Sequence, residues 1–202
     1  MSQDEFLKII EECYNENIDV KSMKFENVEI AEEDFVRAEF QNCEFNNCKI
    51  QFSKMEKITF ADCKFSNCDF SNTSFEGGTF IRCKLKNCKF IGANFIEARI
   101  YNVLLENSVF NYANFSNAKL EKTKFFDCIM KNLSCQEADL KNVDLSNCDL
   151  RLAQFFRTKL KGIDFTTCNI EGITIGVEDI KGAIVTPAQA TDLIKLIEVI
   201  VK

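Results

Sequence analysis

The sequence contains no histidine, and other features that accompany catalysis or membrane insertion are missing as well. Without histidine the commonest general base is absent, and no glycine-rich loop that could hold a phosphate is present. Both absences argue against an enzyme. No run of about 18 apolar residues occurs, so no membrane-spanning helix is expected. The acidic start of the chain is not typical of a secretion signal, and a cytoplasmic protein is expected.

Positive charge is also scarce at one end of the chain. The formal net charge is −6, and no basic stripe is visible, which argues against direct binding of nucleic acid. Residues 1–50 hold thirteen acidic and five basic residues, whereas residues 51–202 hold eighteen acidic and twenty basic ones. The acidity is therefore concentrated near the N-terminus.

What the sequence does contain is a repeat of five residues. From Phe25 to Val185 every fifth residue is apolar, at 33 positions without insertion or deletion, and sixteen of the twenty phenylalanines fall in this phase. Two residues before each of these positions lies a column of small residues, mainly Cys, Ala, Ser and Thr. The other three columns are mostly polar. The period matches neither a helix nor a flat strand, whose side chains repeat at 3.6 and 2 residues.

A chain that turns a corner every five residues closes a square every twenty. Successive squares can stack at the sheet spacing of about 4.8 Å, with the large and the small column pointing inward. Each coil then buries its neighbour, as in other solenoids. The sequence therefore predicts an all-β protein, a four-walled β-helix of about eight coils.

The repeat resembles that of the pentapeptide repeat family, whose loose motif is A(D/N)Lxx. The best matches are "ADLKN" at 138–142, "CDLRL" at 148–152, "ANFSN" at 113–117 and "CDFSN" at 68–72. The resemblance covers about 160 of the 202 residues. It implies a right-handed quadrilateral β-helix.

The eleven cysteines are expected to be free thiols in the core. Most recur at twenty-residue spacing, so stacked neighbours have β-carbons about 4.8 Å apart, slightly beyond disulfide geometry. A buried cysteine behaves as a small apolar residue. A metal site is the alternative, but no Cys-x-x-Cys and no histidine are present to form a zinc site. Neither a metal nor a cofactor is expected.

One outward column is almost uniformly asparagine. Its members are Asn27, Asn47, Asn67, Asn87, Asn107 and Asn147, with Asp127 in the gap. Stacked amides can bond to one another from coil to coil, because each carries a donor and an acceptor. We expect a structural ladder at a corner; a ligand-binding row is the alternative.

The ends of the repeat divide the chain into three segments: 1–22, 23–185 and 186–202. Residues 2–14 predict a short helix that begins with a capping box of Ser2 and Glu5 and covers the first coil with Phe6, Ile9, Ile10 and Cys13. At the other end, Thr186 is expected to cap a second helix, with Pro187 at its first position and Gln189 closing the capping box. Both helices close the open ends of the solenoid.

The C-terminal helix has more apolar surface than one end cap needs. The surplus predicts a homodimer through this helix. The residues expected at the dimer contact are Leu193, Leu196, Ile197 and Ile200.

The C-terminal segment narrows the resemblance. Residues 163–197, "IDFTTCNIEGITIGVEDIKGAIVTPAQATDLIKLI", resemble the end of Qnr-type pentapeptide proteins. The resemblance implies a dimer that binds DNA gyrase and topoisomerase IV by DNA mimicry and protects them from quinolones. The unbroken register from 25 to 185 predicts no projecting loop, which is closer to the loopless MfpA type. The alternative is a non-catalytic scaffold with another partner.

A candidate partner surface lies between residues 91 and 130. Leu104, Val109, Phe126 and Ile129 occupy outward positions around a single corner, and Ile91 and Tyr112 flank them. A contiguous exposed apolar group indicates a docking site, unless a neighbouring element or the N-terminal helix covers it. The acidic end is expected to steer a basic partner toward this site. The steering carboxylates are Glu32, Glu33, Asp34, Glu39 and Glu44.

Overall fold

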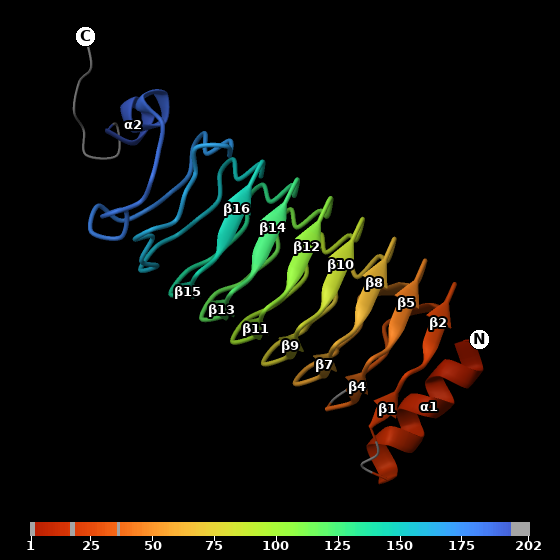
Figure 1. Cartoon of the computed structure of the whole chain (residues 1–202). Coiled ribbons are helices and arrows are strands. Elements are labelled where there is room, and N and C mark those ends of the chain that lie inside the picture. Colours follow the sequence, from red (N-terminus) through yellow and green to blue (C-terminus); the bar gives the residue numbers. More distant parts are fainter. Residues whose placement is uncertain (1–2, 17–18, 36, 195–202) are drawn as a thin grey trace.

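The structure is a computed structural model, and it describes residues 3–16, 19–35 and 37–194. It forms a four-walled β-solenoid with one helix at each end (Figure 1). The helices are α1 (Gln3–Glu16) and α2 (Pro187–Ile194), and the strands are β1 (Val20–Lys21), β2 (Lys24–Glu26), β3 (Glu29–Ala31), β4 (Glu39–Gln41), β5 (Glu44–Asn46), β6 (Lys49–Gln51), β7 (Thr59–Ala61), β8 (Lys64–Ser66), β9 (Thr79–Ile81), β10 (Lys84–Lys86), β11 (Arg99–Tyr101), β12 (Leu104–Glu106), β13 (Lys119–Glu121), β14 (Lys124–Phe126), β15 (Asp139–Lys141) and β16 (Asp144–Ser146).

The strands stack into walls because residues twenty apart pair in parallel. Wall A is the seven-stranded sheet β1-β4-β7-β9-β11-β13-β15, and wall B is the seven-stranded sheet β2-β5-β8-β10-β12-β14-β16. Wall C begins with the pair β3 and β6 and continues through single bridges from Lys49 to Asn169. Wall D consists of bridges from Asp34 to Thr174. Every strand register and bridge joins residues twenty apart, so no projecting loop interrupts the described coils.

The number of coils depends on what is counted. Seven strands per sheet enclose six regular turns, fewer than the eight expected from the repeat. After β16 the coil continues through single bridges, the last of which joins Asp164 and Ile184. The four-walled β-helix itself is confirmed.

The central column fills the interior with stacked aromatic rings. Phe95 lies between Phe75 and Phe115, with ring centroids 5.0 and 4.5 Å away and nearly parallel planes. Phe70, Phe75, Phe90, Phe95 and Phe115 are all buried, as the repeat predicts. The core is thus a ladder in which each ring packs on those of the coils before and after it.

The small column is buried and also hydrogen-bonded. The Cys48 thiol donates to the Phe25 carbonyl oxygen at 3.4 Å, and the Thr73 hydroxyl donates to the Ile50 carbonyl oxygen at 2.7 Å. All eleven cysteines are free and buried, which confirms their predicted state. Treating them as small apolar residues was incomplete, because most of them donate to a backbone carbonyl of the preceding coil.

The corners require a left-handed backbone. Every fifth residue from Ser22 to Arg157 has a positive φ, and twelve of the 26 non-glycine residues in this conformation are asparagine. Asparagine tolerates positive φ better than most residues, which explains its recurrence. Two bonds of the predicted amide ladder are present: Asn67 donates to Asn47 at 3.2 Å, and Asn87 donates to Asn67 at 3.1 Å.

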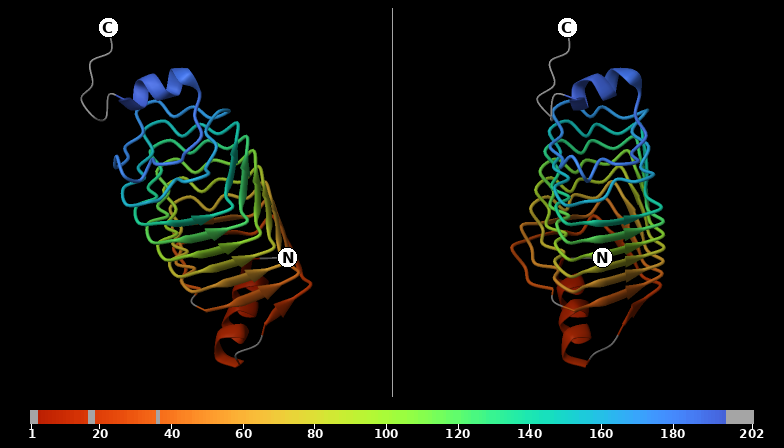
Figure 2. Two further views of the ribbon diagram at one scale, coloured as in Figure 1. Left: turned by 60° about the vertical axis from the view of Figure 1, so that its left-hand side comes forward. Right: turned by 90° about the vertical axis from the view of Figure 1, so that its left-hand side faces the viewer.

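Helices close both ends of the solenoid (Figure 2). Phe6 of α1 contacts the rings of Phe25 and Phe35, with centroids 5.1 and 5.9 Å away, which confirms the N-terminal cap. Its proposed capping box includes Ser2, which lies outside the described residues. The C-terminal capping box is confirmed: the Thr186 N–H donates to Gln189 Oε1 at 2.8 Å, and the Gln189 N–H donates to Thr186 Oγ1 at 3.2 Å.

Candidate interaction surfaces

The apolar residues singled out in the sequence meet at the corner between walls B and C. Leu104 on β12 and Phe126 on β14 lie on wall B, and Val109 pairs with Ile129 on wall C. Phe126 and Ile129 are 42% and 41% exposed, whereas Leu104 and Val109 are half-buried. We call these four residues, together with Ile91 and Tyr112, the mid-rod patch.

Tyr112 and Ile91 lie at the far edge of wall C. Tyr112 is 66% exposed and occupies a corner with φ 60°. Its backbone N–H donates to the Lys131 carbonyl oxygen at 2.9 Å, so the backbone is paired although the side chain projects outward. A bulky side chain at positive φ is unusual and conformationally costly.

No described element covers the mid-rod patch. Helix α1 packs on the first coil at one end, and α2 lies at the other end (Figures 1 and 2). The alternative of an intramolecular cover therefore finds no support among residues 3–16, 19–35 and 37–194. The patch is accessible in the described chain.

The acidic residues singled out as steering groups lie on different sides of the rod. Glu32, Glu33 and Asp34 follow one another around one corner, Glu39 lies on β4 of wall A, and Glu44 lies on β5 of wall B. Glu44 is flanked by Lys24 and Lys64, each 3.0 Å away, and these lysines hold the pKa of its carboxyl below the usual range.

The pairing differs among these carboxylates. Asp34 lies 3.2 Å from Lys54. Glu32, Glu33 and Glu39 form no ion pair with any described residue, so their negative charge is not compensated by a neighbouring cation.

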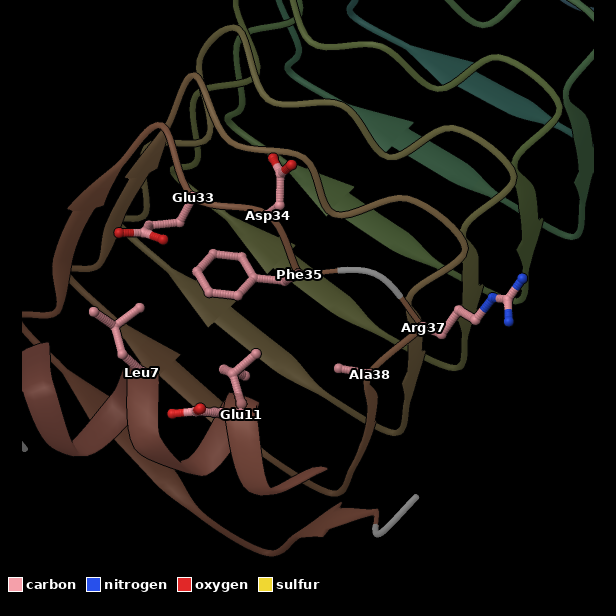
Figure 3. A pocket seen from close by; sticks show the side chains of 8 residues that line it. Leu7, Glu11, Glu33, Asp34, Phe35, Arg37 and Ala38 are labelled. Carbon is pink, nitrogen blue, oxygen red and sulfur yellow. The ribbon is translucent and has the colours of Figure 1, made fainter. Parts of the chain in front are cut away.

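An open pocket of about 620 Å³ separates α1 from the first coil (Figure 3). Leu7 and Glu11 come from the helix, and Glu33, Asp34 and Phe35 come from the facing coil. Its floor is apolar, and its rim carries three carboxylates and the guanidinium of Arg37. The pocket is a place where a cationic side chain could lodge, but it has no set of groups arranged for catalysis.

The C-terminal end has an apolar cleft of about 280 Å³ between the last coil and α2. Leu193 is half-buried there against Ile175 and Ile180, whereas Ile194 and Val177 are exposed. Gln189 fastens the helix by donating to the carbonyl oxygens of two core residues. Leu196, Ile197 and Ile200, the other residues expected at the dimer contact, lie outside the described residues.

Sequence reasoning missed the exposed apolar residues at other corners. Phe52 and Leu152 share the corner row of Tyr112, at positive φ of 53° and 61°. The five-residue period could have placed them there, but the left-handed backbone was not deduced from the sequence.

The described residues also bear on metal binding, membrane spanning and thiol reactivity. No group of three or more His, Cys, Asp or Glu side chains among them is arranged to hold a metal ion. None of the helices in the described part of the chain is long and apolar enough to cross a membrane. Burial raises the pKa of the Cys135 thiol to about 12, so this thiol is not primed as a nucleophile.

Comparison with known proteins agrees with the fold and the repeat. A family model described as "Pentapeptide repeat region" matches residues 58–127 and 78–155. Together with the five-residue period and the four-walled coil, this match shows that the chain is a pentapeptide repeat protein. No curated protein matches the chain.

Two solved structures illustrate the similarity. HetL, a pentapeptide repeat protein involved in heterocyst differentiation regulation from the cyanobacterium Nostoc sp. strain PCC 7120, is 13% identical with a TM-score of 0.56, and the match covers 87% of this chain and 95% of HetL. A trypsin-treated form of QnrB1, a plasmid-mediated fluoroquinolone resistance protein, is 23% identical with a TM-score of 0.50, over 91% of this chain and 98% of that chain. At these identities the likeness concerns the fold.

Proposed function

We propose that this pentapeptide repeat protein is a non-catalytic rod that binds another protein along its outer walls. The mid-rod patch is the observation that carries the proposal. Its apolar side chains form one contiguous group on a mainly polar surface, in which Ile91, Tyr112, Phe126 and Ile129 are exposed and the other two are half-buried. Such groups mark interaction sites on soluble proteins. The stacked rings fill the core, which leaves no internal site for a substrate.

The partner that we propose is a type II topoisomerase, DNA gyrase or topoisomerase IV. The rod occupies the enzyme's DNA-binding surface by DNA mimicry and protects it from quinolones. Two observations support this assignment: QnrB1, a fluoroquinolone resistance protein, shares the fold, and the unpaired carboxylates of Glu32, Glu33 and Glu39 place negative charge at one end. The eleven free thiols suit a reducing cytoplasm.

A scaffold for a different protein is the second candidate. The uneven charge favours it, because a DNA mimic needs negative charge along its length, whereas residues 51–202 hold more basic than acidic residues. HetL, which shares the fold, is involved in the regulation of differentiation. Both candidates use the same outer walls, so direct binding distinguishes them.

The first experiment measures DNA supercoiling by purified gyrase, with and without a fluoroquinolone, over a range of concentrations of this protein. Protection or inhibition at micromolar concentration supports the topoisomerase assignment. Unchanged supercoiling, together with no binding of gyrase to the immobilised protein, rules that assignment out and leaves the scaffold.

Charge variants then test whether the acidic end speeds association with the partner. Glu32→Gln, Glu33→Gln and Glu39→Gln remove charge without breaking an ion pair, and they should slow association and reduce its salt dependence. The matched control is Glu97→Gln, Glu121→Gln and Glu171→Gln, which makes the same change in net charge away from the acidic end. Equal association rates for the two triple variants contradict steering by the acidic end.

We also propose that the protein is a homodimer through its C-terminal end. The exposed apolar residues Val177 and Ile194 beside the C-terminal cleft support the proposal, since a twofold contact there would bury them. Leu193→Glu with Ile194→Glu should give monomers in light scattering. A parent protein that is already monomeric at micromolar concentration contradicts the dimer.

A further inference from the structure

Three lysines border the mid-rod patch and form no ion pair with any described residue. Lys84 and Lys86 lie on β10, and Lys89 follows on wall C; all three are exposed. Lys84 is in register with Leu104 and Lys89 with Val109. The row of lysines therefore lies one coil, about 4.8 Å, before the first apolar row of the patch.

These lysines differ from the other basic residues of walls B and C. Each of the others pairs with a carboxylate: Lys24 and Lys64 with Glu44, Lys49 with Glu29, Lys124 with Asp144, and Lys131 and Arg151 with Asp149. The three without a partner fall in one coil, directly beside the exposed apolar residues. A basic row and an apolar row thus form one continuous surface.

The local charge is opposite to that of the whole chain. Residues 84–92, the stretch of walls B and C that holds the three unpaired lysines, contain no carboxylate and carry a net charge of +3 in a chain of net charge −6. The carboxylate of Asp69, which is in register with Lys89 one coil earlier, accepts bonds from the Ser71 N–H at 3.0 Å and the Ser71 hydroxyl at 2.6 Å rather than pairing with Lys89. The surface therefore offers positive charge to a partner.

The arrangement carries a folding cost. Lys64 and Lys84 are in direct register on neighbouring strands, and like charges in that position are destabilising. Proteins depart from favourable local arrangements mainly at sites used for function. An acidic partner relieves this repulsion when it binds.

We infer that the mid-rod patch and its row of lysines dock an acidic segment of a partner protein, one that carries apolar side chains beside its carboxylates. The carboxylates contact Lys84, Lys86 and Lys89. The apolar side chains pack on the patch residues in the two following coils. The inference rests on the coarser part of the proposed function, that the rod binds a protein, and it requires no topoisomerase.

The residue types favour a protein segment over the phosphates of a nucleic acid. Single-stranded nucleic acid is held by successive aromatic side chains that stack on bases. The patch has only two aromatic side chains, Phe126 on wall B and Tyr112 at the far edge of wall C, and the residues between them, Val109 and Ile129, are aliphatic. Glu106 and Asp127 lie within the same surface and repel a continuous line of phosphates. A peptide can place its carboxylates over the lysines and its apolar side chains elsewhere.

The test selects peptides from a random short-peptide display library on the immobilised full-length protein. Enriched peptides should combine Asp or Glu with Leu, Ile or Phe. The binding of a fluorescent enriched peptide is then measured by anisotropy for the parent and for Lys84→Gln, Lys86→Gln and Lys89→Gln combined. The triple variant should bind about tenfold more weakly, and the parent's affinity should fall as salt is raised.

Two further variants separate charge from packing. The double variant Val109→Ser with Ile129→Ser should also weaken binding of the peptide by about tenfold. Lys119→Gln, Lys159→Gln and Lys161→Gln, which remove the same charge from exposed positions elsewhere on the rod, should leave binding unchanged. A short DNA duplex serves as the competing probe.

The inference is overturned by any of three results: the selected peptides are basic or neutral, no peptide is enriched, or the parent and the first lysine variant bind the peptide equally. Binding of the duplex that depends on the three lysines but not on Val109 and Ile129 overturns it in favour of a nucleic acid. If the lysine variant still protects gyrase, the proposed function stands, and this surface has no role in the protection. Failure in the supercoiling assay leaves the peptide result unaffected.

Discussion

Replacing Phe95 by alanine tests the stacked core directly. The side chain is only 3% exposed, and its ring lies between those of Phe75 and Phe115 in the coils before and after it. Phe90 and Phe110 also contact it from wall C, with centroids 5.6 and 6.4 Å away. The substitution therefore leaves a cavity in the middle of the ladder, with rings above and below it.

The expected loss can be estimated from the burial and the ring contacts. A buried Phe→Ala substitution costs about 3–5 kcal/mol. We expect the upper part of this range, because the two stacked rings on either side are held by strand pairing and cannot move together to close the cavity. Each coil of a solenoid is stabilised mainly by its neighbours, so the defect weakens two interfaces at once.

The assay is urea unfolding followed by far-ultraviolet circular dichroism, under reducing conditions. With an m-value of about 3 kcal/mol/M, the midpoint should fall by about 1–2 M. Phe126→Ala is the matched control, since it removes the same ring from a position that is 42% exposed. Its effect should stay below about 1 kcal/mol. Equal midpoints for Phe95→Ala and the parent refute the assigned register.

Three further predictions concern the corners, one ion pair and the thiols. Phe52→Asn should stabilise the protein by about 1 kcal/mol in the same urea assay, because asparagine accepts the φ of 53° with less strain; a lower midpoint contradicts this. Arg151 holds the pKa of Asp149 at about 2, below its unfolded value, so the ionised carboxylate stabilises the fold above about pH 4 and this stabilisation is lost as the pH falls toward 2. In Asp149→Asn, the free energy of unfolding should therefore change less between pH 2 and pH 4 than in the parent. The expected difference is about 1 kcal/mol after allowance for solvent screening, and an unchanged pH profile contradicts this. All eleven cysteines should react with a thiol reagent in unfolded protein prepared without reductant, whereas the folded protein should react slowly, and fewer than nine reactive thiols would show that some are oxidised.

Much of the local structure followed from the spacing of residues alone. The apolar column identified the buried rings, and the capping box of Thr186 and Gln189 identified the start of α2. Both patterns depend on interactions within a few residues or between units of one repeat, so their meaning does not change with the rest of the fold. The free state of the cysteines followed in the same way, because a fixed twenty-residue spacing determines how far apart stacked thiols lie.

The candidate surface was only partly accessible to this reasoning. The repeat placed Leu104, Val109, Phe126 and Ile129 around one corner. It did not say that the first two are half-buried, nor that α1 and α2 both lie away from them. Burial of an outward side chain depends on its neighbours in other coils and on the positions of the terminal helices. Neither is encoded in a single five-residue unit.

The sequence by itself determined the coil, its core columns and its caps, because a period of five admits one way to bury large and small side chains in alternation. Only the tertiary structure decided which charges remain uncompensated. Ion pairs such as that of Lys64 with Glu44 form between coils, and their formation depends on the reach of each side chain across about 4.8 Å. The unpaired lysines beside the mid-rod patch became visible for this reason, since every basic residue looks equivalent until its cross-coil neighbours are known.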